Sequence, residues 1–291
     1  MFEPKYKVSE LLLSHIKEIT VLTEGLNNLS FPGTILADFE KKANSLSAHA
    51  STSIEGNPLS LTEVKRILKL NSKNVRDTER EVLNYNRILK KLNEKIKRGS
   101  VNINISLICE IQKEITNGLI EKHRCGKLRT EPVFVNDPKS GNPVYLPPDH
   151  PDVPGLMNDL LQFVKEKKGH TDPLILAGLF HKQFVIIHPF VDGNGRTARL
   201  VTKALLADMG LNTFNLFSFE NFYNKNVATY FQRVGSSGNY YEIVRSLDFT
   251  EWLEYFTGGI IDEVLRVKKE LALETATPAS VLQLYHKKLL D

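Results

Sequence analysis

The sequence predicts a mainly α-helical protein, a helical bundle with one β-hairpin and a further helical region at its N-terminus. Apolar side chains recur every three or four residues along most of the chain, and capping residues bracket these segments. One stretch, 131–148, instead joins two short β-prone runs through turn-forming residues. We expect an N-terminal helical region over 1–100, a central domain over 101–260 and a C-terminal helical tail over 261–291.

Helices in the N-terminal region are predicted from their apolar stripes and end signals. The stripe of the helix over 36–55 consists of Leu36, Phe39, Ala43, Leu46, Ala50 and Ile54. Gly56 follows, where a left-handed residue commonly ends a helix. Ser60 and Glu63 in "SLTE" have the spacing of a capping box and predict the next start. A longer helix starts at Asp77 or Thr78 and closes on cations before Gly99.

The central part predicts more helices around a single hairpin. A helix over about 105–117 ends before Gly118. In "EPVFVNDPKSGNPVYLPP" the runs Val133–Val135 and Val144–Leu146 are expected as the two strands. Helices resume over 153–169 and from Thr171 to His188. Aromatic residues predict further packed helices between 213 and 270, and they are Phe214, Phe217, Phe219, Phe222, Tyr230, Phe231, Trp252 and Phe256.

Composition narrows the function classes. The chain has 291 residues, of which 41% are hydrophobic and 25% charged, as is ordinary for a globular protein with a sizeable core. A net charge of +4 is too weak to indicate nucleic acid as a partner. Two cysteines without CxxC spacing, and an N-terminus lacking an apolar core, lead us to expect a cytoplasmic protein. The apolar runs are too short to span a membrane.

The segment 188–199, "HPFVDGNGRTAR", concentrates groups that bind and transfer phosphates. Gly193-Asn194-Gly195 can bring backbone N–H groups close to a ligand, and a helix beginning near Gly195 would offer an anion site. Arg196 and Arg199, three residues apart, can reach the same side of that helix, and each guanidinium matches phosphate oxygens.

Two further residues of this segment complete the chemistry. Asp192 offers a hard oxygen ligand of the kind Mg²⁺ takes beside substrate phosphates. His188 has an ordinary pKa near ~6.5 and can accept a proton. Each residue alone has a structural interpretation, but their coincidence in twelve residues favours a polyphosphate site with a general base. The loose dinucleotide fingerprint Gly193-x-Gly195-x-x-Ala198 is disfavoured, since its flanking segments look helical.

The segment resembles the Fic-domain signature HPFx(D/E)GNGRxxR and matches it at every specified position. The resemblance extends upstream to Gly126, Arg129 and the hairpin, and downstream to "SFENFYNKNVATYFQRV", covering roughly 105–257. It implies a Fic domain that transfers AMP from ATP to a hydroxyl of a target protein, with Mg²⁺.

The resemblance also implies a role for each residue. His188 would be the base, Asp192 would hold Mg²⁺, the 193–195 backbone with the Asn194 side chain would bind the α-phosphate, and Arg196 and Arg199 the β- and γ-phosphates. The hairpin over 131–146 would be a flap that docks the target. The residues implied at the nucleotide are Asp192, Gly193, Asn194, Gly195, Arg196, Thr197, Ala198, Arg199, Val133, Phe134, Val135, Asn136, Tyr230 and Phe231. Many relatives have Tyr-Tyr at 230–231, so Phe231 lacks a hydroxyl but retains stacking.

A second motif precedes the domain. In "STSIEGN", Glu55 falls in the last turn of a helix, where an anion is unfavourable by roughly 0.3–1 kcal/mol, and Ser51 lies on the same face. Ser51, Glu55 and Gly56 match the inhibitory (S/T)xxxE(G/N) motif of self-restrained Fic proteins. That resemblance implies that Glu55 pairs with Arg199 and displaces the γ-phosphate.

Several alternatives stay open at the level of sequence. The same fold could transfer another phosphate-containing group, or remove AMP with Glu55 orienting a water. A nucleotide-sensing module without turnover is a third reading, which the presence of His188 disfavours. Self-modification and a homodimer are further expectations from the resemblance.

Overall fold

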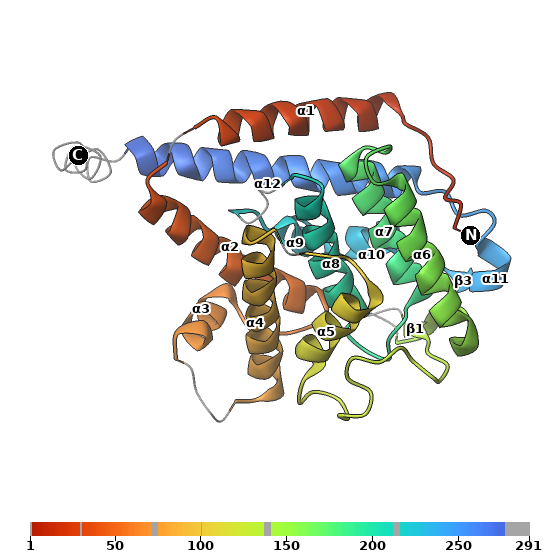
Figure 1. Ribbon diagram of the computed structural model, residues 1–291. Coiled ribbons are helices and arrows are strands. Elements are labelled where there is room, and N and C mark those ends of the chain that lie inside the picture. Colours follow the sequence, from red (N-terminus) through yellow and green to blue (C-terminus); the bar gives the residue numbers. More distant parts are fainter. Residues whose placement is uncertain are drawn as a thin grey trace.

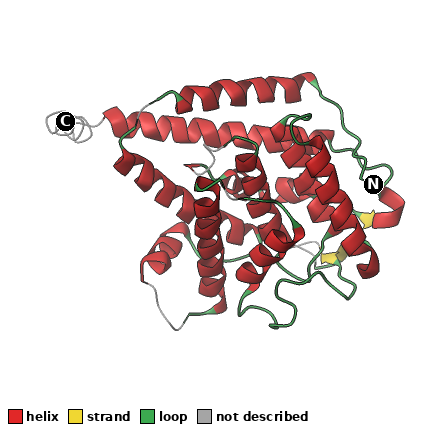
Figure 2. Cartoon of the chain, viewed as in Figure 1, coloured by secondary structure: helices red, strands yellow, loops and turns green. Residues whose placement is uncertain are grey.

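The computed structural model describes residues 2–29, 31–70, 75–99, 101–136, 141–211 and 216–276. Helices dominate this part of the chain, beside one small sheet (Figure 2). The helices are α1 (Glu10–Asn27), α2 (Gly33–Ile54), α3 (Leu61–Leu70), α4 (Asp77–Lys97), α5 (Ile105–Thr116), α6 (Val153–Lys167), α7 (Pro173–Ile187), α8 (Asn194–Asp208), α9 (Phe219–Lys225), α10 (Val227–Val234), α11 (Tyr240–Ile243) and α12 (Thr250–Ala276). The mainly α fold class is therefore confirmed.

Helix α7 is the central helix of the bundle. It packs against α6, α8 and α12 (Figure 1). Most of its side chains are buried whatever direction they point. A helix apolar on every side must lie inside a protein. Helix α1 lies along α12 on one side of the bundle, and α2 contacts α4, α9 and the start of the site helix α8.

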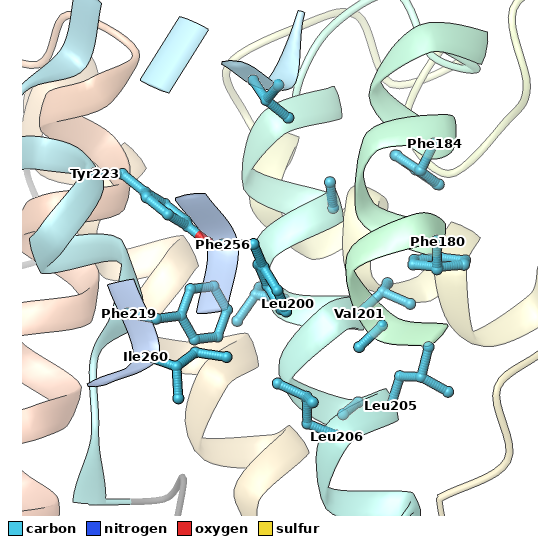
Figure 3. Packing of buried hydrophobic residues seen from close by; sticks show 14 of the residues in the cluster. Phe180, Phe184, Leu200, Val201, Leu205, Leu206, Phe219, Tyr223, Phe256 and Ile260 are labelled. Atoms are coloured by element: carbon cyan, nitrogen blue, oxygen red, sulfur yellow. The ribbon is translucent and has the colours of Figure 1, made fainter. Parts of the chain in front are cut away.

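The core between α7, α8, α9 and α12 is filled by aromatic and aliphatic side chains (Figure 3). Gly178 on α7 lets α12 approach closely, because a Cβ at this position would lie 2.6 Å from a methyl group of Leu253. The indole nitrogen of Trp252 donates to the Gly178 carbonyl at 2.8 Å. This packing fixes α7, and with it the turn that follows Ile187.

The predicted helix signals in the N-terminal region are confirmed. Helix α4 begins at Asp77, and Gly56 has φ +96° after the end of α2. The Ser60 backbone N–H donates to Glu63 at 2.8 Å and the Glu63 N–H to Ser60 Oγ at 3.4 Å, which is the expected capping box. Helix α1 was not predicted. Its apolar stripe is blurred by exposed Leu11, Leu13 and Val21, which are 51%, 44% and 68% exposed.

The hairpin is present, with strand bounds that differ slightly from those expected. Strand β1 is Val135–Asn136 rather than Val133–Val135, and β2 is Pro143–Leu146. Val135 pairs with Tyr145 and Asn136 with Pro143, with an irregularity between the two pairs. The predicted loop tip, like Phe214, falls outside the described residues.

A third strand, β3 (Gly238–Asn239), extends the sheet and was not foreseen. It pairs in parallel with β2, giving the order β1-β2-β3. Two residues are too few for an alternating pattern, so the sequence carried no signal for this strand.

Helix α12 (Thr250–Ala276) runs unbroken across residue 260, so residues 261–276 of the expected C-terminal helical tail continue this helix, and residues 277–291 lie outside the described residues. No helix in the described ranges has the length and apolar character needed to cross a bilayer.

Candidate active site

His188 ends the central helix in an unusual backbone conformation. It is the C-cap of α7, with φ 50° and ψ 60°, and its N–H donates to the Phe184 carbonyl at 3.0 Å. Within the described ranges it is the only residue other than glycine with positive φ. Such a conformation costs about 1–3 kcal/mol and persists only where surrounding contacts enforce it.

The His188 imidazole is half-buried and neutral near pH 7. Its Nδ1 lies 3.3 Å from the Val185 carbonyl, which favours the proton on Nδ1 and leaves Nε2 basic. Burial lowers the pKa of His188 to about 4, and the Arg129 charge acts in the same direction. The bond to Val185 and the carboxylates of Glu55 and Asp192 oppose that shift. The arrangement provides a ring that can accept a proton.

A glycine turn connects His188 to α8. Gly193 has φ +79° and precedes the first residue of the helix, Asn194. The Asn194 side chain accepts from the Phe190 N–H at 2.9 Å and donates to the Phe190 carbonyl at 2.8 Å, which locks the loop. This amide therefore holds the turn, and the free N–H groups of the first turn of α8 remain for an anion.

Arg196 is 5% exposed and paired with two carboxylates. Its Nη2 lies 3.0 and 3.1 Å from the two oxygens of Asp192, and its Nη1 makes a close ion pair with Glu81 of α4. The second oxygen of Glu81 accepts from Asn57 at 2.7 Å. The structure thus connects Arg196 to the turn that follows α2.

Arg199 is completely buried and pairs with the residues predicted to restrain it. Its Nη2 donates to Glu55 at 2.6 Å and to the Ser51 carbonyl at 2.9 Å, while its Nε donates to Ser51 Oγ at 2.8 Å. Burial opposes the charge, but Tyr230 and Glu55 outweigh it and raise the pKa of Arg199. The guanidinium stays charged.

The Glu55 carboxylate also covers the N-terminus of α8. A Cβ added to Gly195 would overlap the carboxylate, so glycine is required there while Glu55 is in place. Gly56, with its positive φ, ends α2 directly after Glu55 and turns the chain away. A protein carboxylate therefore occupies the place where the sequence predicted an anionic ligand.

The comparisons with known proteins agree with this geometry. The family model described as the Fic/DOC family matches residues 102–206, from just before α5 to near the end of α8. Residues 102–206 therefore have the sequence of a Fic domain. The chain is 33% identical over 165 residues to "Protein adenylyltransferase Fic" of Nematostella vectensis, covering 55% of this chain and 36% of that protein. It is 29% identical over 192 residues to the protein of the same name from Aedes aegypti, covering 64% and 37%. The chain thus spans less than two fifths of these relatives.

Solved structures confirm the Fic fold over almost the whole chain. A Fic family protein from Desulfovibrio desulfuricans G20 superposes with a TM-score of 0.77 at 21% identity, covering 95% of this chain and 78% of that one. Fic-1 (aa134–508) of Caenorhabditis elegans gives a TM-score of 0.71 at 21% identity, covering 93% and 75%.

The hairpin residues predicted to lie at the nucleotide are found along the entry to β1. Val133 and Val135 are half-buried, whereas Phe134 is 59% exposed and Asn136 is exposed. Phe134 therefore presents an aromatic ring to solvent beside an edge strand.

The aromatic pair at 230–231 is split between two environments. Tyr230 is 1% exposed, and its hydroxyl accepts from Arg199 at 3.2 Å and lies 3.3 Å from His181 Nε2. Phe231 is half-buried beside it, with ring centroids 5.5 Å apart. On α8, Thr197 and Ala198 are both fully buried, which places them in the packing of the site helix.

Sequence reasoning assigned no role to the residues that reach the site from distant elements. Glu81 pairs with Arg196 and accepts a hydrogen bond from Asn57. Gln112 of α5 donates to the Asp192 carbonyl at 3.1 Å. Arg129 contacts the backbone around His188. Their pairings are long-range, so spacing carried no signal for them, although Arg129 falls within the stretch that resembles Fic domains.

Proposed function

We propose that this chain is a protein adenylyltransferase that transfers AMP from ATP to a serine, threonine or tyrosine hydroxyl of a target protein and releases pyrophosphate. One observation carries the proposal. The neutral, half-buried imidazole of His188 lies on the turn that leads into the N-terminus of α8, and two buried arginines, Arg196 and Arg199, lie in the first turns of that helix. The name shared by the relatives, which this chain covers only in part, supports the same reaction.

The reaction divides between the base and the anion site. Nε2 of His188 takes the proton from the target hydroxyl as its oxygen attacks the α-phosphorus. The bond between the α-phosphorus and the bridging oxygen then breaks, and pyrophosphate leaves. The N–H groups at the start of α8 receive the α-phosphate oxygens, and Arg196 and Arg199 receive the β- and γ-phosphates. Positioning and charge neutralisation supply most of the rate in such transfers.

Asp192 is suited to hold a magnesium ion together with the phosphates. Its side chain is 44% exposed, and its two oxygens already face the cation Arg196. Among the described residues no group of three or more acidic, histidine or cysteine side chains could hold a metal alone. One carboxylate with phosphate oxygens and water is the usual Mg²⁺ arrangement. The bound ion would neutralise charge on the phosphates.

We also propose that Glu55 inhibits the enzyme. It occupies Arg199 and covers Gly195, so a γ-phosphate that needs the same guanidinium must displace it. Ser51 reinforces the contact through two bonds to Arg199.

The flap supports docking of a protein segment. Strand β1 lies at the edge of the sheet order β1-β2-β3, and such an edge can pair with an extended peptide. We propose that the target segment pairs there, beside Phe134; a second copy of this chain as target, and a homodimer, belong to the same proposal. Two free cysteines support a reducing, cytoplasmic location.

The test compares Glu55→Gly with wild type after incubation with ATP labelled on the α-phosphate and Mg²⁺, alone and in cell lysate. We expect Glu55→Gly to incorporate label well above wild type, and Glu55→Gly/His188→Ala to lose on the order of 10²–10⁴-fold. Glu94→Gly, on the exposed face of α4, is the matched Glu-to-Gly control and should resemble wild type.

Intact mass then identifies the chemistry. A gain equal to AMP supports the proposal, whereas a different adduct or loss of AMP from a modified protein would replace it with another reaction. If Glu55→Gly binds nucleotide but incorporates no label, the protein is a nucleotide-sensing module without turnover and the proposed transfer is wrong.

A further inference from the structure

Arg129 lies at a junction between the base of the flap and the end of α7. It is 4% exposed. Its contacts are Nε to the His188 carbonyl at 2.9 Å, Nη2 to the Ile187 carbonyl at 3.5 Å and closely to the Pro148 carbonyl, Nη1 to the Glu131 carbonyl at 3.3 Å, and its own N–H to the Pro189 carbonyl at 2.9 Å. Every one of these partners is a backbone carbonyl.

The carbonyls from α7 explain why an arginine is needed there. The last carbonyls of a helix lack partners within the helix and carry its negative dipole end, so a cation is favourable. The left-handed turn at His188 exposes the carbonyls of 187, 188 and 189 in succession; the Arg129 side chain binds the first two, and its backbone N–H binds the third. A planar guanidinium can serve several acceptors at fixed angles, which an ammonium cannot.

The carbonyls on the other side belong to the hairpin. Glu131 precedes β1 and Pro148 follows β2, so the same side chain holds both ends of the flap. Tyr145 of β2 makes a separate link from the flap to α7, since its hydroxyl donates to the Ile186 carbonyl at 2.9 Å. Arg129 instead contacts the chain before β1, the chain after β2 and the His188 carbonyl itself.

We propose that Arg129 is a positioning residue, which holds His188 in its left-handed conformation and fixes the base of the flap to the same turn. The first half concerns this fold alone. The second half rests on the proposed function, because it means that the base and the segment presenting the target hydroxyl keep one relative position.

Charged side chains approach His188 from three directions. Arg129 approaches from the loop after α5, Glu55 from the end of α2, and Asp192 from the following turn. Arg129 disfavours a protonated ring while the two carboxylates favour it. Removing Arg129 therefore frees the backbone and removes the charge that opposes protonation, and both changes act in the same direction on the ring.

Gln112 provides a matched control. Its Oε1 accepts from the Gly126 N–H at 2.5 Å and its Nε2 donates to the Asp192 carbonyl. It thus anchors the chain just before Arg129 to the catalytic loop through a buried polar contact, and it makes no bond to His188. If Arg129 only held this segment in place, Gln112→Ala would have the same effect.

The experiment follows the His188 ring and backbone directly. Ring resonances of labelled histidine, assigned by His188→Ala, are titrated in wild type, Arg129→Gln, Arg129→Lys and Gln112→Ala, with a crystal structure of each. We expect loss of the positive φ in Arg129→Gln, together with a rise in the pKa of His188 because one of the two causes that lower it is removed. Arg129→Lys, which keeps the charge without the fork, should lie between, and Gln112→Ala should stay near wild type.

Amide hydrogen exchange supplies the flap measurement. We expect faster exchange at 131–136 and 188–192 together in Arg129→Gln. An unchanged φ and pKa in folded Arg129→Gln, or equal changes in Gln112→Ala, would overturn the proposal; if Arg129→Gln does not fold, Arg129→Lys decides by the same criteria. None of these measurements needs adenylylation, so the proposed function can fail while the positioning role stands.

Discussion

The carboxylate of Glu55 lies 2.6 Å from Nη2 of Arg199, although 144 positions separate the two residues. The contact joins the first residue after α2 to the first turns of α8, and it closes the anion site with a protein side chain. Arg199 is fully buried, whereas the Glu55 side chain is 27% exposed, so the acid is the partner that can leave.

Ser51 should share the inhibition with Glu55. Ser51→Ala removes the bond from Arg199 Nε and leaves that donor buried without a partner, while the backbone contact remains. A buried bond to a charged group contributes about 1.5–3 kcal/mol, so we expect incorporation of labelled AMP to rise on the order of tenfold, below the level of Glu55→Gly.

The neighbouring Ser53 is the control for this change. It is half-buried on the same helix and has no recorded side-chain contact with the site, so Ser53→Ala should incorporate label as wild type does. Equal incorporation by Ser51→Ala and wild type would show that Glu55 inhibits without Ser51.

Glu81 should oppose nucleotide binding while stabilising the empty site. It makes a close ion pair with Arg196, and burial raises the pKa of its carboxyl. Glu81→Gln in the Glu55→Gly background removes a negative charge from beside the phosphates, so we expect tighter ATP binding by calorimetry. We also expect a lower free energy of unfolding without nucleotide, because the buried Arg196 then keeps only Asp192 as a carboxylate partner.

Glu110→Gln is the surface counterpart, since Glu110 pairs with Lys95 where both side chains are about two fifths exposed. It should change neither quantity appreciably. Weaker ATP binding by the Glu81 variant would mean that Glu81 orients Arg196 for the phosphates and does not compete with them.

Acid should destabilise the protein through its buried histidines. His181 is fully buried against Tyr230 and Thr202, and burial lowers its pKa to about 3. Since its pKa in the unfolded chain is ~6.5, the unfolded state binds the proton first as pH falls. The stabilisation is complete above that pH and declines towards pH 3, by about 1 kcal/mol per pH unit below pH 6.

Urea unfolding at pH 7, 6 and 5 measures this slope. His181→Gln keeps hydrogen-bonding groups but cannot titrate, so its free energy of unfolding should fall less between pH 6 and pH 5 than that of wild type. Parallel curves would assign the acid sensitivity to other groups, such as His188.

The sequence was sufficient for the parts of the site that are contiguous. His188, Asp192 and the two arginines share one loop and one helix turn, so their spacing alone predicted a common anion site. Glu55 was reached through a motif and a poorly placed charge at a helix end. Glu81 gave no such signal, because an acid near the start of α4 is favourable locally and its pairing with Arg196 depends on how α4 and α8 cross.

The same distinction applies to the fold. Helices with a clean stripe, such as α4 and α5, were located closely, whereas α1 was missed because it leaves large apolar side chains on its outer face. Strand β3 exists only through its two pairings with β2, and no property of Gly238 and Asn239 by themselves anticipates a partner more than 90 positions away.

Because Glu55 is attached to the same chain as Arg199, dilution never weakens their contact. Glu55 is therefore an intramolecular competitor of any phosphate that binds Arg199, with an effective concentration on the order of mM. A higher nucleotide concentration therefore raises the fraction of Arg199 bound to phosphate only gradually. An agent that bends or withdraws the end of α2 removes the competing carboxylate altogether. Abrupt activation is therefore expected from a change in α2 and not from a change in nucleotide concentration.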